Sequence, residues 1–208
     1  MLSAFFKQEA SRNTAYPLIT SEQWAKREAA LSLIGSAQLL DDFKRLRDSL
    51  EAAFARDEDH PPLEIRREFA GLFLRRGGVN PYESVYLGQE GRLMEKPWLD
   101  VRRFYHQHGL HLRSSEDHPE DHISAELGFL ALTSFLAAEA SESERGDYVL
   151  AQLEFVKKHM SKWLPDLVRD IINDRWANIY AEIARCCLHY VQADRQMMEM
   201  VTERRVDG

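Results

Sequence analysis

The chain has 208 residues, of which 44% are hydrophobic and 29% are charged, which suits one domain or at most two small ones with a substantial core. Glycine and proline together make up about 8% of the chain, against an average of roughly 12%, and this scarcity disfavours a β-sandwich or barrel with a turn every roughly 8–12 residues. The formal net charge of -7 disfavours a nucleic-acid-binding protein, because such proteins usually present a basic surface.

The first part of the chain predicts three helices. The first begins with Ser21 as its N-cap and ends at Gly35. The second, over residues 37–57, has an apolar side chain at every third or fourth position. The third covers residues 62–76 and stops at a pair of glycines. Its side chains predicted to face inward are Leu63, Phe69, Leu72 and Phe73.

The middle of the chain predicts a loop, a helix and a hinge. Residues 77–91 contain four glycines and a proline, which indicate a structured loop, and a helix over 97–109 follows. The short polar segment 111–118 is the predicted hinge between an N-terminal half, 1–110, and a C-terminal half, 119–208. A hinge there permits exchange of the second half between protomers, so a monomer or a domain-swapped dimer is expected.

The C-terminal half predicts further helices. Pro119 opens a long helix to about residue 138, with Asp117 and Glu120 spaced as a capping box. That helix is apolar over much of its circumference and is therefore expected to be central. The remaining predicted helices cover 142–163, broken at Leu164-Pro165, then 166–173 and 176–200. The predicted fold is all-α: a single globular bundle of about eight helices.

Cysteine usage and the N-terminal region indicate the compartment. Cys186 and Cys187 are adjacent and have no other cysteine to pair with, so buried thiols in a reducing cytosol are expected. The N-terminal region lacks a secretory apolar segment, and no stretch approaches the roughly 18 apolar residues of a membrane span. We expect a cytoplasmic protein without stable membrane insertion.

The motifs of phosphate-binding loops and of nucleophilic hydrolases are missing, but histidines and carboxylates cluster between residues 106 and 126. His118, His122 and Glu126 fall at i, i+4 and i+8, on one face of a helix, and such ligands can hold zinc or iron. A helical metal-dependent enzyme that uses this cluster is therefore the alternative hypothesis. The other histidines of the cluster are His106, His108 and His111.

The same cluster also suits a peptide-binding site. A carboxylate at Asp121 is stabilised by the positive end of its helix, and His122 can donate a hydrogen bond to a carboxylate or a carbonyl. A buried Glu126 needs hydrogen-bond donors. Hydroxyl groups that can supply them belong to Tyr82, Ser84 and Tyr86. With Phe73 and Phe129 as a roof, these residues form a polar spot in an apolar groove.

Three motifs in this order resemble a known family, the TorD/DmsD-type redox-enzyme maturation chaperones, to which the NarJ type is more distantly related. Leu72-Phe73 followed by Pro81-Tyr-Glu-Ser-Val-Tyr86 resembles the signature of the family's first half. The segment from Pro119 to Leu132 resembles its most specific motif, Asp-His followed by E-L-x-F-x-x-L, and the segment from Phe155 to Trp163 resembles F-x-x-x-H-x-x-x-W.

The resemblance implies an all-helical, non-enzymatic chaperone of the cytoplasm that needs no cofactor. Members of the family bind the twin-arginine signal peptide, and often the body, of a molybdopterin-containing oxidoreductase. They hold this partner until its cofactor is inserted and then release it for export by the Tat pathway. Redox-enzyme maturation of this kind is molybdoenzyme assembly.

The resemblance also implies a site. Asp121 and His122 match family positions implicated in signal-peptide binding, and His159 and Trp163 are expected in the core that shapes the cleft. The paired guanidinium groups of the ligand would bond to carboxylates, and its apolar segment would lie along an apolar strip. The candidate carboxylates are Asp121, Glu83, Glu116 and Glu120, and the strip consists of Leu72, Phe73, Val85 and Phe129. The predicted signal-peptide site comprises Asp121, His122, Glu126, Tyr82, Glu83, Ser84, Tyr86, Leu72, Phe73 and Phe129.

Overall fold

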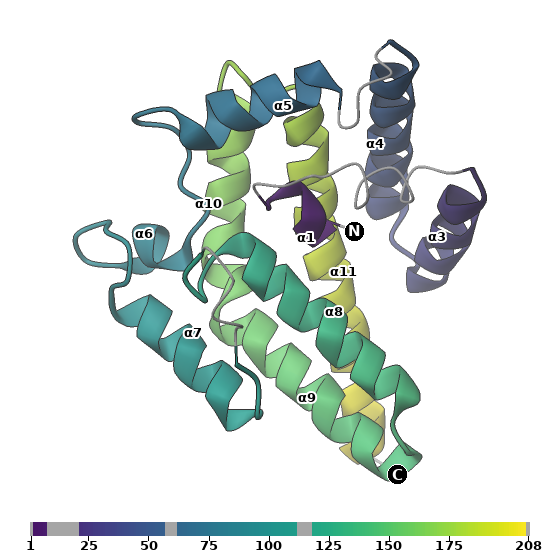
Figure 1. Cartoon of the computed structure of the whole chain (residues 1–208). Helices are drawn as coiled ribbons and strands as arrows, with labels where there is room; N and C mark the ends of the chain where they lie inside the picture. The colour runs from purple at the N-terminus through teal and green to yellow at the C-terminus, as the bar shows by residue number, and fades with distance from the viewer. Residues whose placement is uncertain (1, 8–20, 57–61, 112–117, 207–208) are drawn as a thin grey trace. The chain divides into compact units, whose positions relative to one another are not determined.

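The computed structural model describes residues 2–7, 21–56, 62–111 and 118–206. Over these residues the chain forms ten α-helices, eight of them at least seven residues long, together with one π-helix and no β-strand (Figure 1). The predicted all-α fold is therefore confirmed. Within the same residues no helix combines the length and the apolar character that a bilayer crossing requires.

The contacts of the chain divide it into two units, which are described separately. Unit 1 comprises residues 1–80 and 166–193, and unit 2 comprises residues 81–165 and 194–208. The chain passes between the units three times: between residues 80 and 81, inside α10 (Met160–Asn173) and inside α11 (Ile179–Val206). The division does not test the predicted hinge, because residues 112–117 lie outside the described part of the chain. The hinge, the capping box of Asp117 and the oligomeric state stay predictions.

In unit 1, the first two predicted helices are confirmed, and the short α1 (Leu2–Phe5) precedes them. α3 (Ser21–Ile34) ends where Gly35 adopts a φ of +75°, a left-handed conformation that glycine takes without strain. α4 (Ala37–Arg56) buries its apolar stripe, and Phe43 on that stripe packs edge to face on Trp24 at 4.7 Å between ring centroids.

The third predicted helix, over residues 62–76, is divided into α5 (Leu63–Phe69) and the π-helix η2 (Ala70–Leu74). Leu63 begins α5 and is 40% exposed, so its prediction as an inward-facing residue is wrong: a first-turn side chain has no preceding turn to lie against. A Cβ on Gly71 of η2 would lie 2.4 Å from the indole of Trp176, so the glycine makes room for that ring.

The first turns of α11 supply the centre of unit 1. Tyr180 is buried, and the rings of Phe6, Phe69 and Phe73 surround it at centroid distances between 5.5 and 6.4 Å. Cys186 and Cys187 are buried in the same helix, as predicted. Burial, with smaller contributions from Asp42 and Glu182, raises the pKa of the Cys186 thiol to about 12, so it is held as an unreactive thiol.

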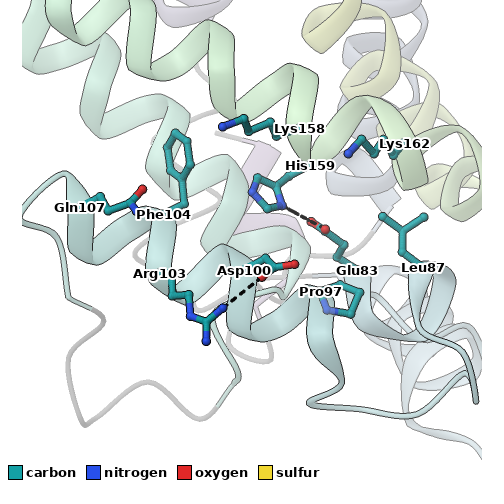
Figure 2. A pocket seen from close by; sticks show the side chains of 10 residues that line it. All are labelled: Glu83, Leu87, Pro97, Asp100, Arg103, Phe104, Gln107, Lys158, His159 and Lys162. Carbon is teal, nitrogen blue, oxygen red and sulfur yellow. Dashed lines mark hydrogen bonds and ion pairs between the residues drawn. The ribbon is translucent and has the colours of Figure 1, made fainter.

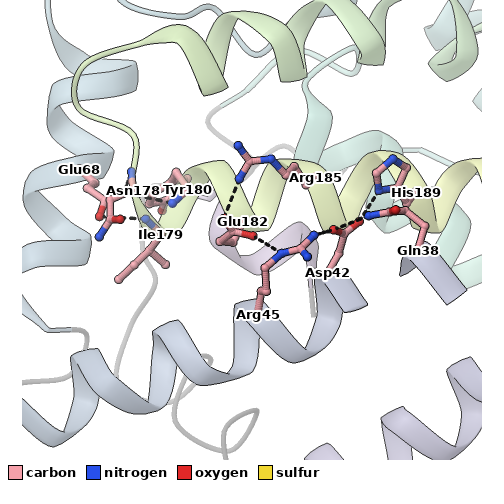
Figure 3. A network of polar contacts seen from close by, with 10 residues as sticks. All are labelled: Gln38, Asp42, Arg45, Glu68, Asn178, Ile179, Tyr180, Glu182, Arg185 and His189. Carbon is pink, nitrogen blue, oxygen red and sulfur yellow. Dashed lines mark hydrogen bonds and ion pairs between the residues drawn. The ribbon is translucent and has the colours of Figure 1, made fainter. Parts of the chain in front are cut away.

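Figure 3 shows how polar side chains attach α11 to its neighbours in unit 1. The buried Glu68 carboxylate accepts hydrogen bonds from three backbone N–H groups at the start of α11, at 2.9, 3.2 and 3.0 Å. Such N–H groups have no partner within their own helix, so a carboxylate there accepts their hydrogen bonds. Its negative charge also interacts favourably with the positive end of the helix dipole. The N–H groups belong to Asn178, Ile179 and Tyr180. Further along α11, His189 pairs with Asp42 and Glu182 pairs with Arg45 at 3.4 Å.

The turn after η2 contains Gly78, a position with no room for a side chain. A Cβ on Gly78 would lie 2.3 Å from the carbonyl oxygen of Leu72, which accepts a hydrogen bond from Val79 and cannot move freely. Gly78→Ala should therefore lower the free energy of unfolding by about 1–3 kcal/mol, a typical cost of forced overpacking. Urea denaturation followed by circular dichroism measures this.

A matched control for Gly78 lies in the helix α8 (Ile123–Glu139). Gly128 has nothing within 4 Å of its Cβ position. Gly128→Ala should raise the free energy of unfolding by about 0.5–1 kcal/mol through helix propensity alone. Equal effects of the two substitutions would contradict the steric argument.

Unit 2 contains a helix that the sequence did not predict. The predicted loop 77–91 includes α6 (Glu83–Leu87), whose five residues begin after Tyr82. Its N-cap makes no local side-chain hydrogen bond, and the cap comes instead from Asp121, far along the chain. Local sequence patterns therefore carry no start signal for α6. The next helix, α7 (Lys96–Gln107), agrees with its prediction and is followed by Gly109 at a φ of +69°.

Two boundaries in the C-terminal half differ from prediction. α8 begins at Ile123 rather than at Pro119, because His122 has an extended backbone and its side chain accepts the N–H of Ser124 at 3.2 Å as an N-cap. α9 (Glu142–Lys158) starts with the capping box of Ser141 and ends at His159, so the predicted break at Leu164-Pro165 is wrong. Pro165 is the sixth residue of α10, where it removes the hydrogen bond to the carbonyl of Ser161 without ending the helix.

The core of unit 2 is aromatic and lies along α8 and α9. Phe129 packs against Tyr105 at 5.2 Å and against Phe155 at 4.6 Å between ring centroids, and Phe104 joins them at 5.8 Å from Phe129. All four side chains are buried. The expectation that α8 is central holds for this part, whereas Phe135 near its end is 61% exposed.

Candidate functional site

Two segments of unit 2 lie antiparallel and join the starts of α6 and α8. The N–H of Glu83 donates to the carbonyl of Asp121, and the N–H of Ile123 donates to the carbonyl of Pro81, both at 2.9 Å. Between them Tyr82 and His122 form an isolated β-bridge. We call residues 81–84 and 118–123 the junction. It gathers residues from two of the three sequence motifs.

Asp121 is the cap of α6 at the junction. Its Oδ2 accepts the N–H of Ser84 at 2.8 Å, and its side chain is 0% exposed. Burial raises the pKa of Asp121 above its usual 3.8, hydrogen bonds from Ser84 oppose this, and the charge of Glu83 adds to the rise. A buried carboxylate that already caps a helix acts first as a structural group.

His122 and its neighbours form a stacked set at the junction. The ring of His118 lies parallel to that of His122 at 4.2 Å, and the ring of Tyr82 meets His122 edge to face at 4.9 Å. Tyr82 Oη lies 3.3 Å from Nδ1 of His118. Burial raises the pKa of Tyr82, with the charge of Asp121 as a second cause. Of these three residues only His122 is fully buried.

Behind the junction lies a set of buried carboxyl groups with aromatic and imidazole partners. Glu126 Oε2 accepts the indole N–H of Trp163 at 3.1 Å, and the two oxygens of Glu83 lie 3.0 and 3.1 Å from Nδ1 of His159. Burial raises the pKa of Glu126 well above its ordinary value, and the charge of Glu83 and a hydrogen bond shared with it add to the rise. Glu126 therefore lies close to the Glu83–His159 pair, in surroundings that favour its neutral form.

A pocket of about 470 Å³ opens on the other side of Glu83 (Figure 2). Its walls come from α6, from α7 and from the break between α9 and α10. Glu83 and His159 form part of its lining, together with the mostly buried Phe104 of the aromatic core. The Glu83–His159 pair therefore lines the pocket, whereas the buried Glu126 does not.

The structure brings eight of the ten predicted site residues together in unit 2. Leu72 and Phe73 belong to unit 1, where Leu72 is buried and Phe73 packs on Tyr180. Of the eight predicted site residues in unit 2, Tyr82 and Tyr86 are half-buried. The other six are buried: Glu83, Ser84, Asp121, His122, Glu126 and Phe129.

Glu126 has a hydrogen-bond donor that the sequence did not predict. Its donor is Trp163, while Tyr86 packs against the Trp163 ring at 5.6 Å. Glu116, a predicted carboxylate for guanidinium binding, lies outside the described residues. Glu120 accepts the indole N–H of Trp98 at 2.6 Å and pairs with Arg102 at 3.5 Å, and its side chain keeps 20% exposure.

The sequence did not identify His159 and Trp163 as partners of the two glutamates. Both were expected in the core, and both are buried. Their i, i+4 spacing was the available signal, because residues at that spacing share a helix face. The sequence does not indicate which acidic residues they meet.

The alternative hypothesis of a metal centre can be compared with the described residues. Among them, no group of three or more His, Cys, Asp or Glu side chains has an arrangement that holds a metal ion. The His118 and His122 rings stack on each other rather than converging on a common point.

Comparison with known proteins identifies the family. The sequence profile described as "Nitrate reductase delta subunit" matches residues 36–169. "Chaperone protein TorD" of Vibrio cholerae serotype O1 (strain M66-2) is 29% identical over 201 residues, covering 95% of this chain and 88% of that protein. The protein of the same name from Photobacterium profundum is 31% identical over 131 residues, covering 62% and 60%. The chain therefore belongs to the nitrate reductase delta subunit family and is similar to its TorD chaperones.

Proposed function

We propose that the chain is a chaperone for the maturation of a molybdopterin-containing oxidoreductase, without enzymatic activity of its own. The observation that carries this proposal is the similarity to TorD chaperones over 95% of the chain. In this proposal the chaperone binds the apo oxidoreductase and its twin-arginine signal peptide in the cytoplasm, and export follows cofactor insertion.

The contacts at the junction suggest that some residues of the proposed peptide site maintain its structure and others contact the peptide. Asp121 and Glu83 are buried and already bonded, so in this proposal they hold the junction in shape. In this proposal the peptide contacts two half-buried residues, Tyr82 and Glu120, and its guanidinium competes with Arg102 for the Glu120 carboxylate. A guanidinium stacks well on a tyrosine ring and bonds well to a carboxylate. Leu72 and Phe73 stay predictions as contacts of the apolar segment.

Calorimetric titration with a synthetic twin-arginine peptide tests this arrangement. Tyr82→Ala should weaken binding about 10-fold, because truncating an aromatic contact residue typically costs more than about 1 kcal/mol. The wild type should also bind a peptide with both arginines replaced by glutamine at least about 10-fold more weakly. Both titrations should be carried out at a temperature at which every protein used is folded.

Tyr148→Ala is the matched control, since Tyr148 is likewise half-buried but lies on α9. It should leave the affinity unchanged. Equal affinity of the wild type and a folded Tyr82→Ala protein would overturn the proposed site. Stoichiometric zinc or iron in protein purified without an affinity tag would instead favour the metalloenzyme.

A further inference from the structure

The pocket beside Glu83 has a lining that is partly apolar and partly charged. Leu87 and Pro97 lie on its α6 and α7 sides, and the ring of Phe104 faces it from α7 (Figure 2). Phe104 is held from behind by contacts with Phe129 and Phe155 at 5.8 and 5.3 Å between ring centroids. This side of the pocket is an apolar surface with a well-packed aromatic ring, which suits the apolar part of an organic molecule.

The acidic groups of the pocket already have cationic or imidazole partners inside it. Glu83 is paired with His159 at 3.0 Å, and Asp100 with Arg103 at 3.6 Å. Neither carboxylate is left to attract a cation. A cationic ligand would have to break one of these pairs.

The two lysines of the pocket have no acidic partner among its lining residues. Lys158 pairs with Glu154, which does not line the pocket, and the Lys162 side chain has no ion-pair or hydrogen-bond partner among the described residues. Both come from the α9–α10 side of the pocket, whereas Pro97 and Phe104 come from α7 (Figure 2). With Glu83, Asp100 and Lys158 each paired, the positive charge left over in the pocket is that of Lys162. An anion beside Lys162 gains attraction that the protein does not itself supply, and Lys158 adds to it in part because its charge is shared with Glu154.

We propose that this pocket is a binding site for a small organic acid, a carboxylate attached to an apolar or aromatic body. The carboxylate binds at Lys162 and Lys158, and the body lies against Leu87, Pro97 and Phe104. The site is separate from the proposed peptide surface at Tyr82 and Glu120, and it does not depend on the proposed function.

Phenylacetate is the probe that tests the charge and the body separately. It should bind saturably with millimolar affinity, as expected for a ligand of this size. Phenylacetamide, which has the same shape without the charge, and acetate, which lacks the ring, should each bind at least about 5-fold more weakly. Isotope-labelled protein in a nuclear magnetic resonance titration gives these affinities and locates the site through the amide signals of Leu87, Phe104 and Lys162.

Substitutions assign the binding to the lysines. Lys162→Ala should weaken phenylacetate binding about 5- to 10-fold, and because Lys162 is exposed the variant should stay folded, which a melting curve checks. Lys44→Ala, which removes a lysine of unit 1, should leave the affinity unchanged. Equal binding of phenylacetamide, unchanged binding in Lys162→Ala, or shifts confined to residues outside the pocket would each overturn the proposal. Preference for phenyl phosphate over phenylacetate would overturn the assignment to carboxylates.

Discussion

Trp163→Ala should lower the free energy of unfolding by about 4 kcal/mol, within the range of about 3–5 kcal/mol for truncating a buried aromatic side chain. The Trp163 side chain is 0% exposed, stacks near Tyr86 and donates its indole N–H to Glu126. Its loss leaves a cavity and removes the hydrogen bond that Glu126 receives. Urea denaturation followed by circular dichroism measures the change.

Trp163→Phe separates the two contributions. Phenylalanine fills much of the space but cannot donate a hydrogen bond, so this variant should lose about 1–3 kcal/mol, the cost of a buried acceptor left without its donor. Phe135→Ala is the control for truncation of an aromatic residue, since Phe135 is 61% exposed on α8 and should change stability by less than about 0.5 kcal/mol. A Trp163→Phe protein as stable as the wild type would show that the bond to Glu126 contributes nothing.

Glu126→Gln should make the protein more stable than the wild type at neutral pH. Burial, with the charge of Glu83, holds the pKa of Glu126 well above its ordinary value of 4.5 in the folded protein. Above a pH of about 4.5 the unfolded chain releases this proton while the folded protein keeps it, so stability falls as pH rises, by up to ~1.4 kcal/mol per pH unit. The fall ends once pH exceeds the folded pKa. Glutamine does not ionise, so the Glu126→Gln protein does not lose stability in this way.

Denaturation curves for Glu126→Gln between about pH 4 and pH 8 should accordingly diverge upward from those of the wild type. A shallower slope remains, because burial also raises the pKa of Asp121 and of Asp194. Glu126→Ala is the contrasting variant: it removes the acceptor of Trp163 and should be less stable than Glu126→Gln at every pH. Parallel curves for the wild type and Glu126→Gln would show that Glu126 ionises normally.

Most helices were predictable because their signals are local. The stripe of α4, the glycine after α3 and the glycine after α7 stand in the sequence itself. α6 was not predictable, because its cap is the side chain of Asp121, 37 residues away from Ser84. The break at His159 was missed for the same reason: no glycine or proline marks it, and the His159 side chain is held by Glu83 from another motif.

The sequence indicated which residues lie near one another better than it indicated how they are buried and bonded. The structure places Tyr82, Asp121, His122 and Glu126 in one region of unit 2, as the motif positions indicate, and their role in peptide binding stays a prediction. Burial was not readable from the motifs, since a carboxylate that caps a buried helix and one that awaits a ligand look alike in sequence. The pairing of glutamates with His159 and Trp163 depends on how α9 ends and α10 begins, which only the packed structure reveals.

The pairing of Glu83 with His159 has a consequence for how the chain folds as it is synthesised. The two residues are 76 positions apart, and at translation rates of roughly 5–20 residues per second the partner follows roughly 4–15 s later. Asp121, which caps α6, also appears after the helix it caps. Until both have left the ribosome, the start of α6 has unpaired N–H groups and Glu83 has no imidazole beside it. Unit 2 therefore completes its polar interior only late in translation, and the nascent chain spends seconds with these groups in water.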